Sequence, residues 1–153
     1  MIEQRLTDLG IELPQAAMPL ASYVPVHVAG DLAFVAGQVP LQDGAPTIVG
    51  RLGADVSLED AQVAARRCAL QGLAALRMTL GSLDRVVGIA KVDAFVACEP
   101  GFTDQPKVAN GASDVLVEIF GDAGKHARAA VGVTSLPLGV PVEVALVARI
   151  AQD

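Results

Sequence analysis

The chain is poor in the side chains that hold metals and disulfides. Its 153 residues include two cysteines, Cys68 and Cys98, and two histidines, His27 and His126. The thirty-residue separation of two lone cysteines excludes a cysteine-based zinc site and argues against a disulfide framework. We expect both thiols to be small buried side chains. The histidines are too few and too isolated to indicate a metal centre.

Positive charge and aromatic rings are also scarce. Eleven Lys and Arg stand against 17 Asp and Glu, and there are one Tyr, four Phe and no Trp. Nucleic-acid-binding proteins need a basic surface, and single-strand binders add aromatic rings on which bases stack. The composition therefore predicts no nucleic-acid partner. Phosphate-binding glycine loops, zinc-protease motifs and serine-hydrolase motifs are missing as well.

No hydrophobic run is long enough to cross a membrane. Hydrophobic residues make up 52% of the chain and the mean hydropathy is +0.48, but no apolar run reaches the roughly 20 residues required. We interpret the excess as a buried interface between subunits, because obligate interfaces resemble a core cut in half. The first ten residues include acids and no apolar signal core. We therefore expect no membrane partner, no secretory signal and a cytoplasmic location.

Helix signals predict one short and two long helices. The length of the chain suits a single domain, 1–153, in which 1–20 form an N-terminal extension. The three helices are expected over 2–9, from Ser57 to Gly81, and from about Pro106 to Gly121. Pro14 and Pro19 mark an extended connector after the first helix.

Strand signals complete an α+β domain. Alternating or β-branched runs predict strands over 23–29, 32–39, 86–97, 129–134 and 142–151. Between the second strand and the first long helix, the stretch from Asp43-Gly44 to Gly53 is expected to be a loop. The resulting order is β-β-α-β-α-β-β, with the two long helices on one face of a mixed sheet.

Two charged side chains stand in otherwise apolar C-terminal strands. Arg128 precedes Glu143 by fifteen positions. A charge in such a strand costs several kcal/mol unless something pairs with it. The two side chains therefore pair with each other or with a neighbouring subunit, or they line a cleft in which a small ligand completes the arrangement.

Six short motifs in a fixed order resemble those of the RidA/YjgF family. They are Tyr23, Gly37-Gln38-Val39-Pro40, Asn110, Ala127-Arg128, Leu136-Pro137 and Val142-Glu143-Val144. Their order and spacing agree with the family over about residues 20–151. Apparent insertions around Gly50 and Thr103 indicate a divergent subgroup. The resemblance implies a chorismate-mutase-like fold and a homotrimer with clefts between its subunits.

The resemblance also implies an activity, the hydrolysis of reactive 2-imino or enamine acids to 2-keto acids and ammonia. No cofactor is needed, because an imine carbon is already electrophilic. Arg128 matches the residue that holds the substrate carboxylate, which a guanidinium binds through two parallel hydrogen bonds. Glu143 matches the glutamate proposed to activate water. Tyr23, Asn110 and the backbone amide of Gly37 complete the substrate-binding set.

Three departures from the family pattern make the expected site more apolar or alter its rim. Ala36 stands where deaminases usually have a hydroxyl residue, and Ala130 replaces a cysteine or other polar residue. His126 stands where many relatives have proline, and either contributes to the site or closes a loop, the loop being the favoured reading.

Of these departures, Ala36 favours an alternative function, a non-catalytic protein that binds or senses a small carboxylate such as a 2-keto acid. A scaffold that acts through partner proteins also remains open. Chorismate mutase activity would follow from the fold alone. The substrate of that reaction is a dianion and needs several cations around it, whereas the sequence places one cation, Arg128, in the site.

Overall fold

A five-stranded mixed sheet forms one layer of the protein. The computed structural model describes residues 1–18 and 21–152. The strand order is β1-β2-β7-β5-β6, and β5 and β6 are parallel while the other neighbours are antiparallel. These strands are β1 (Val26–Ala29), β2 (Leu32–Gln38), β5 (Val86–Ala97), β6 (Ala127–Val133) and β7 (Val142–Ile150).

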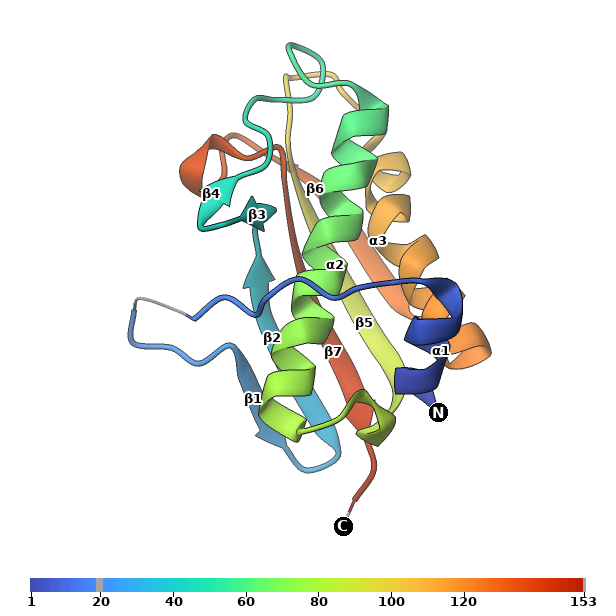
Figure 1. Ribbon diagram of the computed structural model, residues 1–153. Coiled ribbons are helices and arrows are strands. Elements are labelled where there is room, and N and C mark those ends of the chain that lie inside the picture. The colour runs from blue at the N-terminus through green and yellow to red at the C-terminus, as the bar shows by residue number, and fades with distance from the viewer. Residues whose placement is uncertain (19–20, 153) are drawn as a thin grey trace.

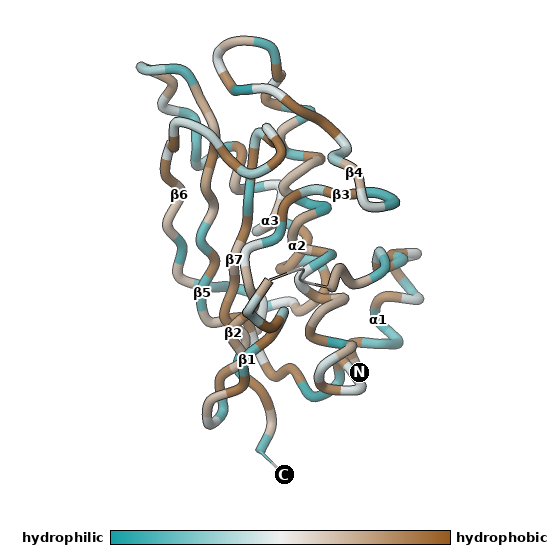
Figure 2. Tube along the Cα trace, turned by 90° about the vertical axis from the view of Figure 1, so that its left-hand side faces the viewer, coloured by the Kyte–Doolittle hydropathy of each residue, from teal (hydrophilic) through white to brown (hydrophobic). Residues whose placement is uncertain are grey.

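The helices cover one face of this sheet. The α-helices of the described residues are α1 (Ile2–Leu9), α2 (Leu58–Leu80) and α3 (Gln105–Phe120). Figure 1 shows α2 and α3 running across the strands, and Figure 2 shows the sheet on one side and the helices on the other. Short 3-10 turns occur at η1 (Leu83–Arg85), η2 (Gly121–Gly124) and η3 (Pro137–Gly139). The predicted α+β class and strand–helix order are confirmed.

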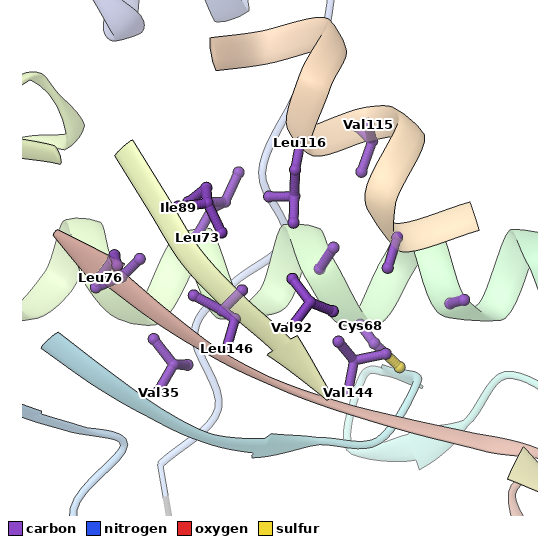
Figure 3. Close-up of a cluster of buried hydrophobic side chains, with 14 of the residues drawn as sticks. Val35, Cys68, Leu73, Leu76, Ile89, Val92, Val115, Leu116, Val144 and Leu146 are labelled. Carbon is purple, nitrogen blue, oxygen red and sulfur yellow. The ribbon is translucent and has the colours of Figure 1, made fainter. Parts of the chain in front are cut away.

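The core lies between the sheet and the two long helices. Alternate residues of the central strands point at the helices because strand side chains alternate between faces. Figure 3 shows Val35, Val92, Val144 and Leu146 from the strands meeting side chains of both helices, which are Cys68, Leu73, Leu76, Val115 and Leu116. Burial raises the pKa of the Cys68 thiol, so it stays protonated and packs as a small apolar group, as predicted. The other cysteine, Cys98, is half-buried.

The opposite face of the sheet carries no helix, and we call it the bare face. Phe34 pairs with Val147, and Val131 pairs with Phe95, so all four side chains lie on that face. Phe34 is 44% exposed and Val131 is 47% exposed. Large apolar side chains therefore stand in water on a face with no cover within the described chain.

Helix ends follow the predicted signals. Ser57 Oγ accepts a hydrogen bond from the Asp60 amide at 3.1 Å, which caps the N-terminus of α2. Gly10, Gly81 and Gly121 follow the last residues of the three helices, each with a positive φ that favours glycine. None of the helices in the described residues is long and apolar enough to span a membrane.

Some predicted boundaries are wrong. The first strand begins at Val26 rather than residue 23, because Pro25 has no amide hydrogen to donate to a ladder. The loop predicted from Asp43-Gly44 to Gly53 includes a short strand, β4 (Ala45–Pro46), which forms a small hairpin with β3 (Leu41–Gln42) just before it. Asp43 and Gly44, both with positive φ, turn it in the way that an Asp-Gly pair favours. Pro19, the second marker of the predicted connector, lies outside the described residues.

Candidate functional site

Arg128 lies in a cluster of polar side chains at the edge of the sheet. It stands on the edge strand β6, and its neighbour across the ladder is Val92, whose side chain faces the helices. Arg128 Nη1 donates to Asn110 Oδ1 at 2.8 Å and to Ser113 Oγ at 3.1 Å. His126 extends the cluster, with its Nε2 2.8 Å from Ser113 Oγ. We call these four residues the arginine half-site.

A close crossing of two helices sets the position of Asn110 and Ser113. Gly111 lies between them in α3, and a Cβ built there would stand 2.1 Å from the backbone oxygen of Gln62 in α2. Any side chain at residue 111 would push the helices apart. The Gln62 side chain also donates to the Lys107 carbonyl at 2.9 Å, across the same crossing. The glycine thus fixes where α3 presents its polar residues to β6.

Tyr23 lies in a different place, at a small apolar cavity. Its volume is about 270 Å³, and Ala36, Gly37 and Leu138 line it together with Tyr23. Tyr23 is 56% exposed, and its hydroxyl has no hydrogen-bond partner among residues 1–18 and 21–152. The sequence predicted Tyr23 and the 36–38 segment on one sheet. They share the cavity instead, with Tyr23 in the bend before β1.

Glu143 lies directly beside this cavity, against Gly37. Gly37 stands at an irregularity of the β2–β7 ladder, and a Cβ built on it would be 2.7 Å from Glu143 Oε2. The absence of a side chain at Gly37 is therefore what makes room for the carboxylate. Burial raises the pKa of the Glu143 carboxyl above its ordinary value. We call Tyr23, Ala36, Gly37, Leu138 and Glu143 the tyrosine half-site.

The two half-sites lie on opposite faces of the sheet. Along β5, Val92 is paired with Arg128 and Phe95 with Glu143. Positions three apart on one strand point to opposite faces, and β5 also separates β6 from β7. The sequence left open an ion pair between Arg128 and Glu143, and within one chain that pair does not form.

The structure therefore groups the predicted residues in two sets. Arg128 and Asn110 meet, as do Tyr23, Gly37 and Glu143, but neither set reaches the other within the chain. Sequence reasoning missed Ser113, although its position one turn after Asn110 places both on one face of α3. His126 was assigned to the loop in preference to the site, and it contacts both. Its Nδ1 lies 2.6 Å from the Gly124 carbonyl oxygen of η2.

The cluster offers hydrogen-bond donors, and His126 is its one imidazole or carboxylate side chain. The described residues contain no group of three or more His, Cys, Asp or Glu side chains that could hold a metal ion. The Arg128 guanidinium has no carboxylate partner among the residues that the structure describes. Such a guanidinium can bind an anion, and a carboxylate fits its planar donors.

Comparison with known proteins places the whole chain among relatives. Residues 3–150 match the family described as “YjgF/chorismate_mutase-like, putative endoribonuclease”. Protein TCP17 of Trypanosoma cruzi is 45% identical over 144 residues, which are 94% of this chain and 90% of that protein. Both the N-terminal segment and the C-terminal strands thus lie within the matched region.

Two solved structures share the fold closely. The protein Atu1372 from Agrobacterium tumefaciens superposes with a TM-score of 0.90 and is 41% identical, covering 98% of this chain and 92% of its own. A “putative endoribonuclease” from Shewanella oneidensis superposes with a TM-score of 0.92 and is 33% identical, covering 98% of this chain and 99% of its own.

Proposed function

Because the chain belongs to the YjgF/chorismate mutase-like family, we propose that it hydrolyses reactive 2-imino and enamine acids to 2-keto acids and ammonia. The observation that carries this proposal is Arg128. Its guanidinium is held at Nη1 by two neutral oxygens and has no acidic partner among the described residues. An arginine held in this way keeps its charge for a carboxylate ligand.

The complete site requires a second copy of the chain. Arg128 and Glu143 project from opposite faces of the sheet, so one subunit presents one half-site to each of two neighbours. The bare face, with the partly exposed Phe34 and Val131, supplies an apolar surface for such contacts. A closed ring of three subunits uses both surfaces of every copy. We therefore propose a homotrimer with three clefts, each formed by the arginine half-site of one subunit and the tyrosine half-site of the next.

The proposed chemistry needs one anion clamp and one proton carrier. Arg128 binds the carboxylate of a 2-imino acid, with Asn110 and the Gly37 amide completing the binding set. Glu143 takes a proton from a water molecule as the water oxygen bonds to the imine carbon. It gives this proton to the nitrogen, which completes a carbinolamine, and then carries the carbinolamine hydroxyl proton to the same nitrogen, so that ammonia leaves as the C–N bond breaks and the keto group forms. The raised pKa of Glu143 brings the carboxyl closer to the pH at which it must both accept and donate.

A trapping assay tests the proposal. An amino-acid oxidase generates 2-iminopropionate, and the rate of its capture by semicarbazide is measured with and without the protein. We expect the protein to compete with the trap, and Arg128→Ala to reduce this activity by about a hundredfold or more. Arg66→Ala is the matched control, because Arg66 forms an exposed ion pair with Glu118 on the helix layer. Wild-type protein that does not accelerate hydrolysis of several imino acids would refute the enzymatic proposal.

Ala36 favours a second candidate, a protein that binds a small 2-keto acid without turning over an imine. The cavity beside Gly37 has an alanine where deaminases usually have a hydroxyl group, so it offers one polar contact fewer. Ala36→Ser restores that hydroxyl. Activity that appears only in this variant, with pyruvate binding present in both proteins, would identify the natural protein as the binder.

The family description names RNA cleavage, but the composition of this chain does not favour that activity. The net charge of −6 and the absence of tryptophan give the chain little with which to hold a phosphate backbone or stack bases. We accordingly propose that its partners are a small carboxylate and further copies of itself.

A further inference from the structure

Behind Arg128, three hydrogen bonds form a continuous series that ends at the backbone oxygen of Gly124 in η2. Arg128 Nη1 donates to Ser113 Oγ at 3.1 Å, Ser113 Oγ lies 2.8 Å from His126 Nε2, and His126 Nδ1 lies 2.6 Å from the Gly124 oxygen. Asn110 Oδ1 accepts a second hydrogen bond from the same Arg128 nitrogen. This series of hydrogen bonds joins β6, α3 and the loop before β6 at one point.

With a neutral His126 ring, the chemistry of the two ends fixes the direction of every hydrogen bond in this series. The Gly124 carbonyl can only accept, so His126 Nδ1 carries the hydrogen. In the neutral ring Nε2 is then an acceptor, and the Ser113 hydroxyl donates to it. The hydroxyl oxygen is thereby left to accept from Arg128. His126 thus selects the orientation of Ser113 that suits the arginine.

Without His126 the serine has a competing partner. A serine inside a helix readily donates its hydroxyl hydrogen to the carbonyl four residues earlier, which here belongs to Ala109. That orientation turns the hydroxyl toward its own helix and away from β6.

The two hydrogen bonds from Nη1 matter because Arg128 is exposed on an edge strand. A free arginine side chain loses about 2 kcal/mol of rotamer entropy when a ligand immobilises it. Here both hydrogens of Nη1 are already bonded, so Nε and Nη2 remain as a planar pair of donors. That pair matches the two oxygens of a carboxylate, and ordering it in advance lowers the cost of binding.

We propose that Ser113 and His126 are positioning residues, which hold the Arg128 guanidinium in the orientation that binds a carboxylate. The inference rests on the proposed function of Arg128 as the carboxylate clamp. Neither residue touches the ligand in this arrangement. Their effect is on the affinity for the carboxylate rather than on the reacting carbon.

Two substitutions of one residue separate positioning from folding. His126→Gln places an amide near the position of Nε2, so its oxygen can still accept from Ser113. His126→Asn places the amide near Nδ1, so it keeps the bond to Gly124 and loses the bond to Ser113. We expect His126→Asn and Ser113→Ala to weaken pyruvate binding about five- to tenfold, while His126→Gln and Ser113→Thr stay within about twofold of wild type.

Calorimetric titration with pyruvate gives the affinities, and nitrogen NMR of the His126 ring gives an independent reading. We expect the ring to hold its hydrogen on Nδ1 in both proteins, because Gly124 is unchanged, and Ser113→Ala to shift the resonance of Nε2, which loses its hydrogen-bond donor. In imine hydrolysis the same variants should raise KM and leave kcat nearly unchanged, since binding is lost equally in ground and transition states.

The outcomes separate this inference from the proposed function. If Arg128→Ala abolishes pyruvate binding while Ser113→Ala and His126→Asn leave it unchanged, the clamp stands and the positioning role is wrong. If Arg128→Ala leaves binding unchanged, the proposed clamp is wrong, and the NMR signal of the Arg128 Nε–H still reports whether Ser113 orders the guanidinium. Equal signals in wild type and Ser113→Ala would overturn the ordering itself.

Discussion

The two half-sites are built on opposite physical principles. In the arginine half-site, Arg128, Asn110, Ser113 and His126 are joined by short hydrogen bonds within one subunit. In the tyrosine half-site the cavity is mostly apolar, and the Tyr23 hydroxyl has no partner within the described residues. The arginine half-site is already organised around a positive charge, whereas the tyrosine half-site offers an apolar cavity and a carboxyl group with a raised pKa. In the proposed function, the carboxylate clamp and the proton carrier therefore lie on different surfaces of the chain.

Mixing two inactive variants gives the largest test of this comparison. Arg128→Ala destroys one half-site and Glu143→Gln the other, and each alone should lose most of its hydrolytic activity, about 10²- to 10⁴-fold. If the chain forms the proposed trimer, unfolding and refolding the two variants together gives mixed trimers. If each cleft takes one half-site from each of two subunits, about a quarter of the clefts in a random equal mixture are intact. Activity should therefore return to about that fraction of the wild-type value.

The control for this experiment is each variant refolded alone at the same total concentration. Mixed trimers without recovered activity, shown by size-exclusion chromatography to be assembled, would contradict a cleft shared between subunits. Such a result would mean that the two half-sites act separately and do not combine into one cleft.

Gly37→Ala tests the closest contact in the tyrosine half-site. The added methyl group would stand 2.7 Å from Glu143 Oε2, so the carboxylate must move away from the cavity. We expect about a tenfold or greater loss of kcat with little change in pyruvate affinity, because a displaced base costs more in chemistry than in binding. The rate of imine hydrolysis and a pyruvate titration measure the two effects. Equal losses in both would show that Gly37 acts mainly through binding.

How far the sequence could predict this arrangement differs between the fold and the site. Helix ends marked by Ser57, Gly81 and Gly121 were predictable because capping is local chemistry. The start of the first strand was misplaced because a run of alternating residues before Val26 is interrupted by Pro25, whose missing amide hydrogen decides the boundary.

The sequence suggested the candidate residues through a resemblance, but it could not show that they divide into two groups in the folded chain. Which face of a sheet a residue joins depends on strand order and register, and β5 lies between β6 and β7 only in the folded sheet. Ser113 was missed because its role comes from contacts with residues 13 and 15 positions away, on other elements. Local patterns do not contain that information.

Leu138 offers a smaller test of the tyrosine half-site. It lines the cavity with a left-handed backbone at φ 60°, which is unfavourable for leucine. Leu138→Gly should relieve this strain and raise the free energy of unfolding by about 0.5 kcal/mol, since part of the gain is offset by glycine's greater freedom when unfolded. Chemical denaturation at fixed protein concentration measures the change.

Leu138→Ala is the matched control for that variant, because it removes the same apolar side chain but keeps the strained backbone. Both variants should bind 2-keto acids with longer apolar side chains less selectively than wild type. Stabilisation by alanine as large as that by glycine would show that the side chain, and not the backbone, is the source of the effect.

The smallest expected effect is the pH dependence of stability at Glu143. Burial raises the pKa of this carboxyl in the folded protein above its ordinary value of 4.5, so the folded state binds the proton more tightly than the unfolded chain. The ionised form therefore costs stability above the folded-state pKa, and the cost disappears below the unfolded value. Glu143→Gln should be more stable than wild type by a few tenths of a kcal/mol at neutral pH, a modest value because Glu143 is only half-buried. The gap should close as the pH falls through the folded-state pKa toward 4.5, as measured by denaturation at one protein concentration. A gap of constant size across that range would mean that the glutamine stabilises by its shape, and that the carboxylate of the tyrosine half-site carries no burial cost.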